Sequence, residues 1–320
     1  MSISASGSVS MSDVRSEYGP ASGAISMSDY YSHSSGLPTA GVVSMDDFRG
    51  ETFDVIDFET ASGSYSPRPN SATYVHIFAV GGGGSGGSSE ADTSGLTTGV
   101  AASSGGGGGA VSHHRLATAD FTGSYTLTIG TGGSGVTSPG DHFLAGNSGS
   151  ATTVTGNSTT LSAGGGPAGN ADEDSTSGGD TSVAAAASPA STATGGSQDN
   201  WSGGVSGSAT ASGSGTLLSA SGGGAAAFSS SSYDSAATGN SQTSTGGLVS
   251  TKNDLPDVIA TYLSDRGQSF TLSDFDATNG VNSGNTSSPI YGSGSGGACH
   301  GSRTSGSGGA GAVIIIYEVT

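Results

Sequence analysis

The residues Ala72-Thr-Tyr-Val-His-Ile-Phe-Ala-Val80 run without a break into Gly81-Gly-Gly-Gly-Ser-Gly-Gly87. The first part is apolar at both odd and even positions, which is typical of a central strand buried on both faces. The second part has almost no side chain to bury, and glycine loses more backbone entropy on folding than any other residue. Such a run either stays disordered or packs where only a bare backbone fits.

The same order of strand and glycine recurs along the chain. Val313-Ile-Ile-Ile-Tyr-Glu-Val319 follows a glycine-rich stretch, and Ser124-Tyr-Thr-Leu-Thr-Ile129 leads into one, with Tyr125, Leu127 and Ile129 expected to point inward. Two further runs, 151–155 and 158–163, flank Gly156-Asn157, which predicts a hairpin. This regularity favours packing over disorder.

We expect the strands near 73–80 and 312–319 to pair, so that the glycine segments between them are held at both ends. Contiguous glycine favours an extended helix with three residues per turn, like polyproline II, and such helices pack side by side because no Cβ intervenes. Neighbouring segments then satisfy each other's backbone N–H and C=O groups. The sequence therefore predicts a mainly β fold with extensive polyglycine, polyproline II-like loops.

Composition narrows the function classes. Glycine occupies 60 of 320 positions and only 32% of the residues are hydrophobic, so the core is small and an oligomer is expected. The net charge of −18 and the single lysine, Lys252, argue against nucleic acid. No apolar run reaches the length of a membrane span, and no secretory signal is recognisable at the start.

A repeat marks the first fifty residues, which read Val9-Ser-Met-Ser-Asp13, Ile25-Ser-Met-Ser-Asp29 and Val43-Ser-Met-Asp-Asp47. In each copy a serine stands three residues before an aspartate, as in a capping box, and the dipole of a helix start favours that aspartate. Apolar residues flank each copy as in a hydrophobic staple. We expect three short capped helices that dock onto a partner, the alternative being capped turns on a flexible tail. The attachment residues are Val9, Asp13, Ile25, Asp29, Tyr30, Val43, Asp47 and Phe48.

One helical pattern stands apart late in the chain. Residues 253–263 have Asp254 as a cap, Pro256 in the first turn, and apolar side chains at 258, 259, 262 and 263. We expect a small helix packed on the sheet. Residues 170–250 have few apolar anchors, and loops are expected there.

The run 63–87, with Gly309-Ala-Gly-Ala-Val-Ile-Ile-Ile-Tyr-Glu318, resembles the glycine-rich domain of tailed-phage tail fibre and receptor-recognition proteins, including adhesin-like and minor tail proteins. The N-terminal Ser-Met-Ser-Asp repeats look like those that precede such domains. The resemblance covers roughly residues 1–130 and 300–320. It implies a virion component whose loops between glycine clusters contact the bacterial surface, and the candidate loops here are 88–104, 168–196 and 229–247.

Aromatic residues in or near those loops are the candidate receptor contacts, because rigid rings contribute strongly to interfaces. They are Trp201, Phe228, Tyr233 and Tyr291. The alternative is that they fill a sparse core, and for Trp201 the two interpretations weigh equally.

The search for enzymatic or ligand-binding motifs finds weak candidates. Gly130-Thr-Gly-Gly-Ser-Gly135 lacks the lysine of a phosphate loop. His113 and His114 are adjacent, so they would face opposite sides of a strand, and Cys299-His300 lacks a scaffold for nucleophilic catalysis. These patterns predict no enzyme and no zinc site.

Two groups of acidic residues leave a metal site and a catalytic site open as alternatives. Asp172, Glu173, Asp174 and Asp180 offer oxygen ligands suited to calcium, with a solvated acidic loop as the alternative. Asp57, Glu59 and Glu90 would supply a carboxylate pair for glycan cleavage, but the sequence does not set their separation.

Together these observations predict two parts. Residues 1–60 form a virion-attachment segment, and residues 61–320 form the glycine-rich β domain. The expected function is that of a structural protein of a tailed-phage virion, a tail fibre or tail-tip component that contacts a protein or glycan receptor on the host and is assembled in the host cytoplasm. A capsid decoration or head fibre protein is the alternative, and an ice-binding protein is a further one.

Overall fold

The structure is a computed structural model. It describes residues 55–67, 72–89, 100–138, 143–157, 159–174, 181–183, 191–194, 197–201, 209–211, 217–220, 237–238, 242–244, 291–292, 294–295, 298–299 and 304–318. The N-terminal repeats and the predicted helix at 253–263 lie outside these residues. Within the described part of the chain, no helix is long and apolar enough to cross a membrane.

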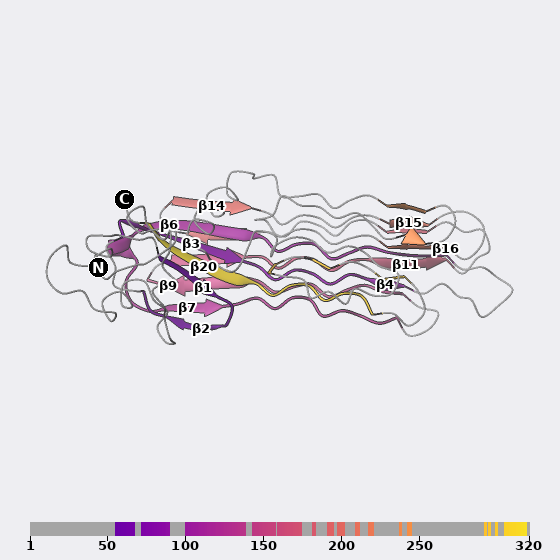
Figure 1. The fold of residues 1–320 in the computed structure, drawn as a ribbon, viewed down its shortest axis with the longest axis horizontal. Helices are drawn as coiled ribbons and strands as arrows, with labels where there is room; N and C mark the ends of the chain where they lie inside the picture. The colour runs from indigo at the N-terminus through magenta and orange to yellow at the C-terminus, as the bar shows by residue number, and fades with distance from the viewer. Residues whose placement is uncertain are drawn as a thin grey trace, which may run out of the picture.

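The described chain is mainly β, and its one short helical turn is η2, Thr118–Asp120. Figure 1 shows an elongated molecule, with two larger sheets at one end, small strands at the other, and long irregular segments running between them. We call the first end the sandwich and the other the distal end.

The sandwich consists of two five-stranded sheets. Sheet I has the order β1-β20-β3-β6-β14, and sheet II has the order β13-β10-β9-β7-β2. All pairs in both sheets are antiparallel. The strands of sheet I are β1 (Val55–Glu59), β20 (Ala312–Glu318), β3 (Tyr74–Val80), β6 (Val111–Ala117) and β14 (Ser197–Trp201); those of sheet II are β13 (Ser191–Thr194), β10 (Thr159–Ala163), β9 (Thr152–Gly156), β7 (Tyr125–Thr128) and β2 (Gly63–Tyr65).

The predicted pairing of the two apolar strands is confirmed. β3 and β20 lie side by side in the middle of sheet I, from Tyr74 opposite Glu318 to Val80 opposite Ala312. The predicted hairpin is also confirmed, because β9 and β10 pair around Asn157, whose φ of 42° is the left-handed conformation that asparagine tolerates. On β7 the side chains of Tyr125 and Leu127 point inward as expected, and Ile129 packs against the same core.

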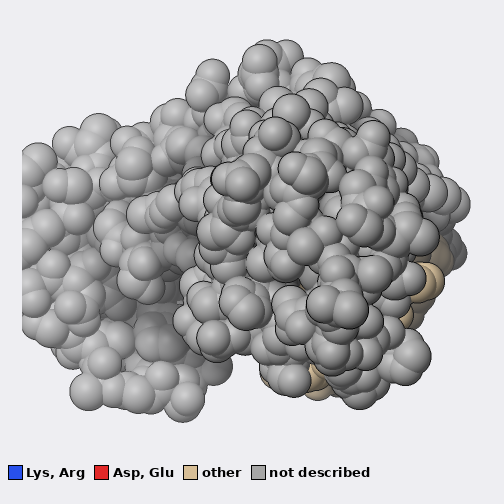
Figure 2. Space-filling model, turned by 90° about the vertical axis from the view of Figure 1, so that its right-hand side faces the viewer, with Lys and Arg blue, Asp and Glu red and all other residues tan. Residues whose placement is uncertain are grey.

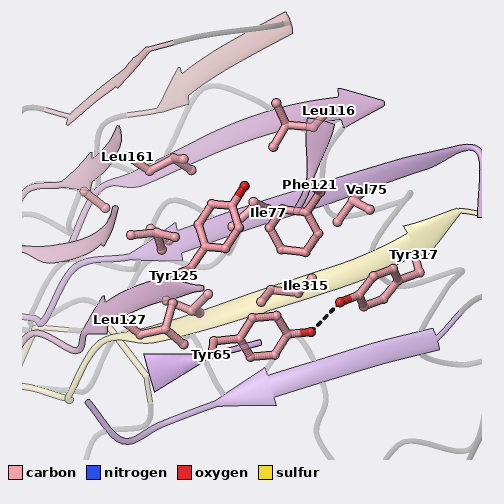
Figure 3. Close-up of a cluster of buried hydrophobic side chains, with 14 of the residues drawn as sticks. Tyr65, Val75, Ile77, Leu116, Phe121, Tyr125, Leu127, Leu161, Ile315 and Tyr317 are labelled. Atoms are coloured by element: carbon pink, nitrogen blue, oxygen red, sulfur yellow. Dashed lines mark hydrogen bonds between the residues drawn. The ribbon is translucent and has the colours of Figure 1, made fainter. Parts of the chain in front are cut away.

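The core lies between the two sheets. Alternate residues of β3 and β20 face it, and sheet II contributes residues such as Leu127, Val154 and Leu161. Figure 3 shows these side chains meeting between strands that are distant in sequence. Leu161, Ile77 and Ile315 are fully buried, so this compact cluster anchors a chain that has few other large apolar residues.

The distal end contains three small sheets, with the orders β11-β5-β16-β17, β12-β15-β18 and β19-β4-β8. The loops expected over residues 170–250 are therefore wrong in part, since eight strands fall there within the described ranges. Strands of Ser, Thr and Ala pair through their backbones, but they lack the alternation of apolar and polar residues from which a strand is predicted. The distal strands are β4 (Ser88–Ser89), β5 (Val100–Ser103), β8 (Phe143–Leu144), β11 (Ala171–Asp174), β12 (Thr181–Val183), β15 (Ala209–Ala211), β16 (Leu217–Ala220), β17 (Ala237–Thr238), β18 (Gln242–Ser244) and β19 (Ala298–Cys299).

Candidate functional site

The segments between the sandwich and the distal end are the glycine clusters of the sequence. They form a set of neighbouring chains that we call the glycine bundle (Figure 1). Its members are residues 81–87, 104–110, 130–135, 145–151, 164–170, 292, 294–295 and 305–311.

Residues 81–87 donate their N–H groups to neighbours that change with a period of three. Gly81, Gly84 and Gly87 donate to the segment 104–110, over N···O distances of 2.9, 2.9 and 3.0 Å. Gly82 and Ser85 donate to the segment 145–151, and Gly83 donates to Gly309. A β-strand alternates with a period of two, so this segment is bonded in another way.

The carbonyl groups of the same segment reach three further neighbours. Those of Gly82 and Ser85 accept from Gly166 and Gly169, which belong to the segment 164–170. Those of Gly83 and Gly84 accept from Gly133 and Ser295, respectively. Residues 81–87 are thus hydrogen-bonded to six surrounding segments, and all seven of their N–H groups and four of their carbonyl groups have partners inside the protein.

The spacing between these segments leaves no room for side chains. A Cβ on Gly84 would lie 2.0 Å from the carbonyl oxygen of Pro167, and one on Gly109 would lie 2.0 Å from that of Gly81. A Cβ on Gly166 would lie 2.0 Å from the carbonyl oxygen of Gly107. Because the obstacle in each case is backbone, a small shift of a flexible side chain cannot relieve it.

Buried serines fill places in the bundle where a backbone partner is missing. The Oγ of Ser295 accepts a hydrogen bond from the N–H of Gly86 at 3.0 Å and donates to the carbonyl of Gly306. The Oγ of Ser85 accepts from the N–H of Asn147 at 2.7 Å. Both serines are fully buried.

The glycine run 130–135 belongs to this bundle. The N–H of Gly133 donates to Gly83, and its carbonyl accepts from Gly308. A Cβ on Gly132 would already collide with Gly308. The N–H groups of Gly130, Thr131 and Gly135 are likewise bonded to side-chain hydroxyls of the protein.

The distal end presents two exposed apolar side chains. Phe143 and Leu144 form β8, the edge strand of the sheet β19-β4-β8, and they are 48% and 40% exposed. Consecutive strand residues point to opposite faces, so apolar surface is open on both sides of this strand. Figure 2 looks onto the distal end, where the visible described residues are uncharged.

Of the four predicted receptor contacts, the structure describes two, and it places both at the sandwich. Trp201 ends β14, opposite Val111 of β6. The ring of Tyr291 packs edge-on against Phe58, with centroids 4.9 Å apart. Phe228 and Tyr233 lie outside the described residues.

The exposed pair on β8 was missed by sequence reasoning. Phe143-Leu144 stands alone between Pro139-Gly140 and Gly146, a short apolar dipeptide without periodicity. An isolated large apolar pair inside glycine-rich sequence is the signal that could have identified it.

Three of the four calcium candidates, Asp172, Glu173 and Asp174, lie on one strand, β11. Asp172 is half-buried on β11, which pairs with β5, and Asp180 lies outside the described residues together with Glu90. Among the described residues, no group of three or more His, Cys, Asp or Glu side chains is placed to hold a metal ion. Calcium binding stays a prediction.

Asp57, one member of the proposed carboxylate pair, lies inside the sandwich. Its carboxylate accepts a hydrogen bond of 2.6 Å from the phenol of Tyr65. The phenol oxygen of Tyr65 is also 2.6 Å from that of Tyr317, and Figure 3 shows this second bond. These groups connect β1, β2 and β20. Burial, with Asp57 and Tyr317 adding to it, raises the pKa of Tyr65 far above its usual value.

This network predicts a loss of stability at alkaline pH. The phenol of Tyr65 stays protonated in the folded protein but ionises near pH 10 in the unfolded chain, so stability is retained below pH 10 and falls above it by about 1.4 kcal/mol per pH unit. Tyr65→Phe should remove the contribution of this phenol to the fall of stability above pH 10. At pH 7 the same variant should lower stability by about 1–3 kcal/mol, because its hydrogen bonds are lost. Urea unfolding from pH 7 to pH 11 measures both effects, and an unchanged slope would contradict the assignment.

Comparison with known proteins agrees with the glycine-rich character of the chain. A family model described as a glycine-rich domain matches residues 60–318, from the residue after β1 to the end of β20. No curated protein matches the chain at a significant level. Since the family model covers most of the sequence, this chain belongs to the glycine-rich domain family.

Proposed function

We propose that this protein is a structural component of a tailed-phage virion, a tail fibre or tail-tip protein that contacts the host receptor with its distal end. The observation that supports this function most is the glycine bundle, which separates the sandwich from the distal strands along the length of the molecule (Figure 1). A close-packed bundle is a stiff spacer, as a protein that presents a binding surface away from a particle requires.

The bundle itself is best explained as packed polyglycine helices of the polyproline II type. The three-residue period of the bonds from residues 81–87 equals the number of residues per turn in that helix. Six hydrogen-bonded neighbours around one segment also agree with helices packed side by side.

The direction of β1 within the sandwich favours attachment at the opposite end from the distal strands. Val55, the first residue of β1, is opposite Tyr317, whereas Val80 and Ala312 mark the edge that leads into the bundle. The chain therefore enters β1 at the side of the sandwich away from the bundle. In this proposal the attachment segment, residues 1–60, docks the protein to other tail or baseplate proteins.

The proposal requires no chemistry on a substrate, and the protein acts by binding. The distal pair Phe143 and Leu144 adds a contact candidate to those expected from the sequence. Exposed apolar side chains near the centre of an interface supply much of its binding energy, since water is excluded around them.

Competition for adsorption tests this function. Excess purified full-length protein should reduce attachment of the parent phage to its host, and the double variant Phe143→Asp/Leu144→Asp should compete about tenfold less well or worse. The matched control is Thr126→Asp/Thr128→Asp, which places the same charge on exposed positions of β7 in the sandwich.

Three outcomes are informative. Equal competition by the two double variants would remove β8 from the contact surface. No competition by the unaltered protein would remove receptor binding altogether. Antibody labelling of virions that marks the head instead of the tail would favour the capsid decoration alternative.

A further inference from the structure

Strand β8 at the distal end is an edge strand with an open outer side. It pairs with β4, Phe143 opposite Ser89 and Leu144 opposite Ser88, and β4 lies among the distal strands in Figure 1. Apart from this ladder, Phe143 and Leu144 form no hydrogen bond in the part of the chain that the structure describes. Both side chains also remain exposed, so neither is covered by another layer of chain.

The pairing with β4 leaves backbone hydrogen-bonding groups of β8 directed to the open side. Successive residues of an antiparallel strand alternate, one turning both its N–H and its C=O toward the partner strand and the next turning both away. One of the two β8 residues therefore presents an N–H donor and a C=O acceptor at the outer edge. An edge of this kind is a template for a further strand, which supplies the two missing partners.

The side chains of β8 suit an added strand on both of its faces. Consecutive strand residues point to opposite faces, so an added strand would lie beside Phe143 on one face and beside Leu144 on the other. Cross-strand pairs of aromatic, leucine and β-branched side chains stabilise such a pairing. The segment that fits this edge is therefore extended, with apolar side chains at two consecutive positions.

The chemistry of β4 and β8 argues against a glycan or a second copy of this chain at the edge. Ser88 and Ser89 of β4 are 1% exposed, so the accessible side chains of these two strands are those of Phe143 and Leu144. Sugar hydroxyls that leave water need hydrogen-bonding partners, which phenylalanine and leucine side chains do not provide. Two copies of this chain, each with a formal net charge of −18, repel each other.

We propose that the receptor is a protein, and that an extended segment of it adds to β8 as a further strand of the sheet β19-β4-β8. The backbone edge supplies hydrogen bonds that do not depend on the partner's sequence, whereas Phe143 and Leu144 select segments with apolar side chains. This inference rests on the proposed function and specifies the partner of the same distal surface.

Binding of fluorescently labelled full-length protein to cells of the host distinguishes a protein receptor from a glycan. Digestion of the cell surface with proteinase K should abolish binding, whereas periodate oxidation of the surface glycans should leave it unchanged. Binding that survives proteinase K and is lost after periodate would overturn this inference and leave the proposed function intact. Absence of binding to untreated cells would contradict the proposed function itself.

The single variants Phe143→Pro and Leu144→Pro test the strand pairing, because proline has no N–H to donate to an added strand. The variant with the smaller loss of Tm is the one whose N–H faces the open side, since the other also loses a bond to β4. Measured below its Tm, that variant should bind untreated host cells about tenfold less well or worse.

The matched control is Ser66→Pro, at an exposed position just after β2 in the sandwich, and it should bind as the unaltered protein does. Full binding by the proline variant that keeps the ladder to β4, or an equal loss in the control, would overturn strand addition at β8. Sedimentation of the same proteins tests the other occupant. Self-association of the unaltered protein that this proline variant abolishes would assign the edge to a second copy and overturn the proposal.

Discussion

Replacing Gly84 with alanine should lower the free energy of unfolding by about 3 kcal/mol or more, a large effect for one added methyl group. The new Cβ would lie 2.0 Å from the carbonyl oxygen and 2.7 Å from the carbonyl carbon of Pro167. Relief requires the segment 164–170 to move away, which lengthens the hydrogen bonds of Gly166 and Gly169 to residues 81–87. For a domain of this size the expected fall in Tm is about 6 °C or more.

The matched control is Gly63→Ala on β2. A Cβ at this position meets no atom within 4 Å, and the residue is exposed. Alanine restricts the unfolded chain more than glycine does, so the control should be neutral or stabilising by about 0.4–1 kcal/mol. Similar Tm values for the Gly84 and Gly63 variants in thermal unfolding would contradict close packing of the bundle.

Replacing Ser295 with alanine should cost about 2–6 kcal/mol, because two buried backbone groups lose their partner at once. The N–H of Gly86 donates to the Ser295 hydroxyl, and that hydroxyl donates to the carbonyl of Gly306. All three residues are buried, so water does not replace the lost bonds without opening the bundle.

Ser307→Ala tests the same chemistry at the surface. The Ser307 hydroxyl accepts from the N–H of Gly135 at 3.0 Å, but the serine is exposed and water can take its place. This variant should change stability by about 0.5 kcal/mol at most. Denaturant midpoints of the two serine variants provide the measurement, and equal losses would show that burial of Ser295 does not matter.

The sandwich was largely predictable because its strands carry dense apolar patterns. Residues 74–80 and 312–318 are the two most apolar runs of the chain, and they pair in the middle of sheet I. The hairpin at Asn157 was predictable from a residue pair with a specific backbone preference.

The distal strands and the contacts of the bundle were not predictable in the same way. β15, Ala209–Ala211, and its partners contain alanine, serine and threonine, which give no hydrophobic period. In the bundle, glycine has no side chain whose chemistry would indicate which segment lies next to it. The hydrogen-bond partners of residues 81–87 therefore depend on the whole fold and not on the local sequence.

The candidate receptor contacts were also only partly predictable from the sequence. Trp201 and Tyr291 stand out by their side chains, yet their positions at the sandwich depend on strand register and chain path. Phe143 and Leu144 became candidates only through their exposure at the distal end.

Hydrogen exchange of the backbone amides of residues 81–87 tests the central claim, that the glycine clusters form a packed and hydrogen-bonded bundle, most directly. All seven amides, whose partners lie on four neighbouring segments, should exchange as slowly as those of β3, within about tenfold, because bundle and sandwich open together. Exchange of these amides at the rate of an unstructured chain, while β3 stays protected, would contradict the account.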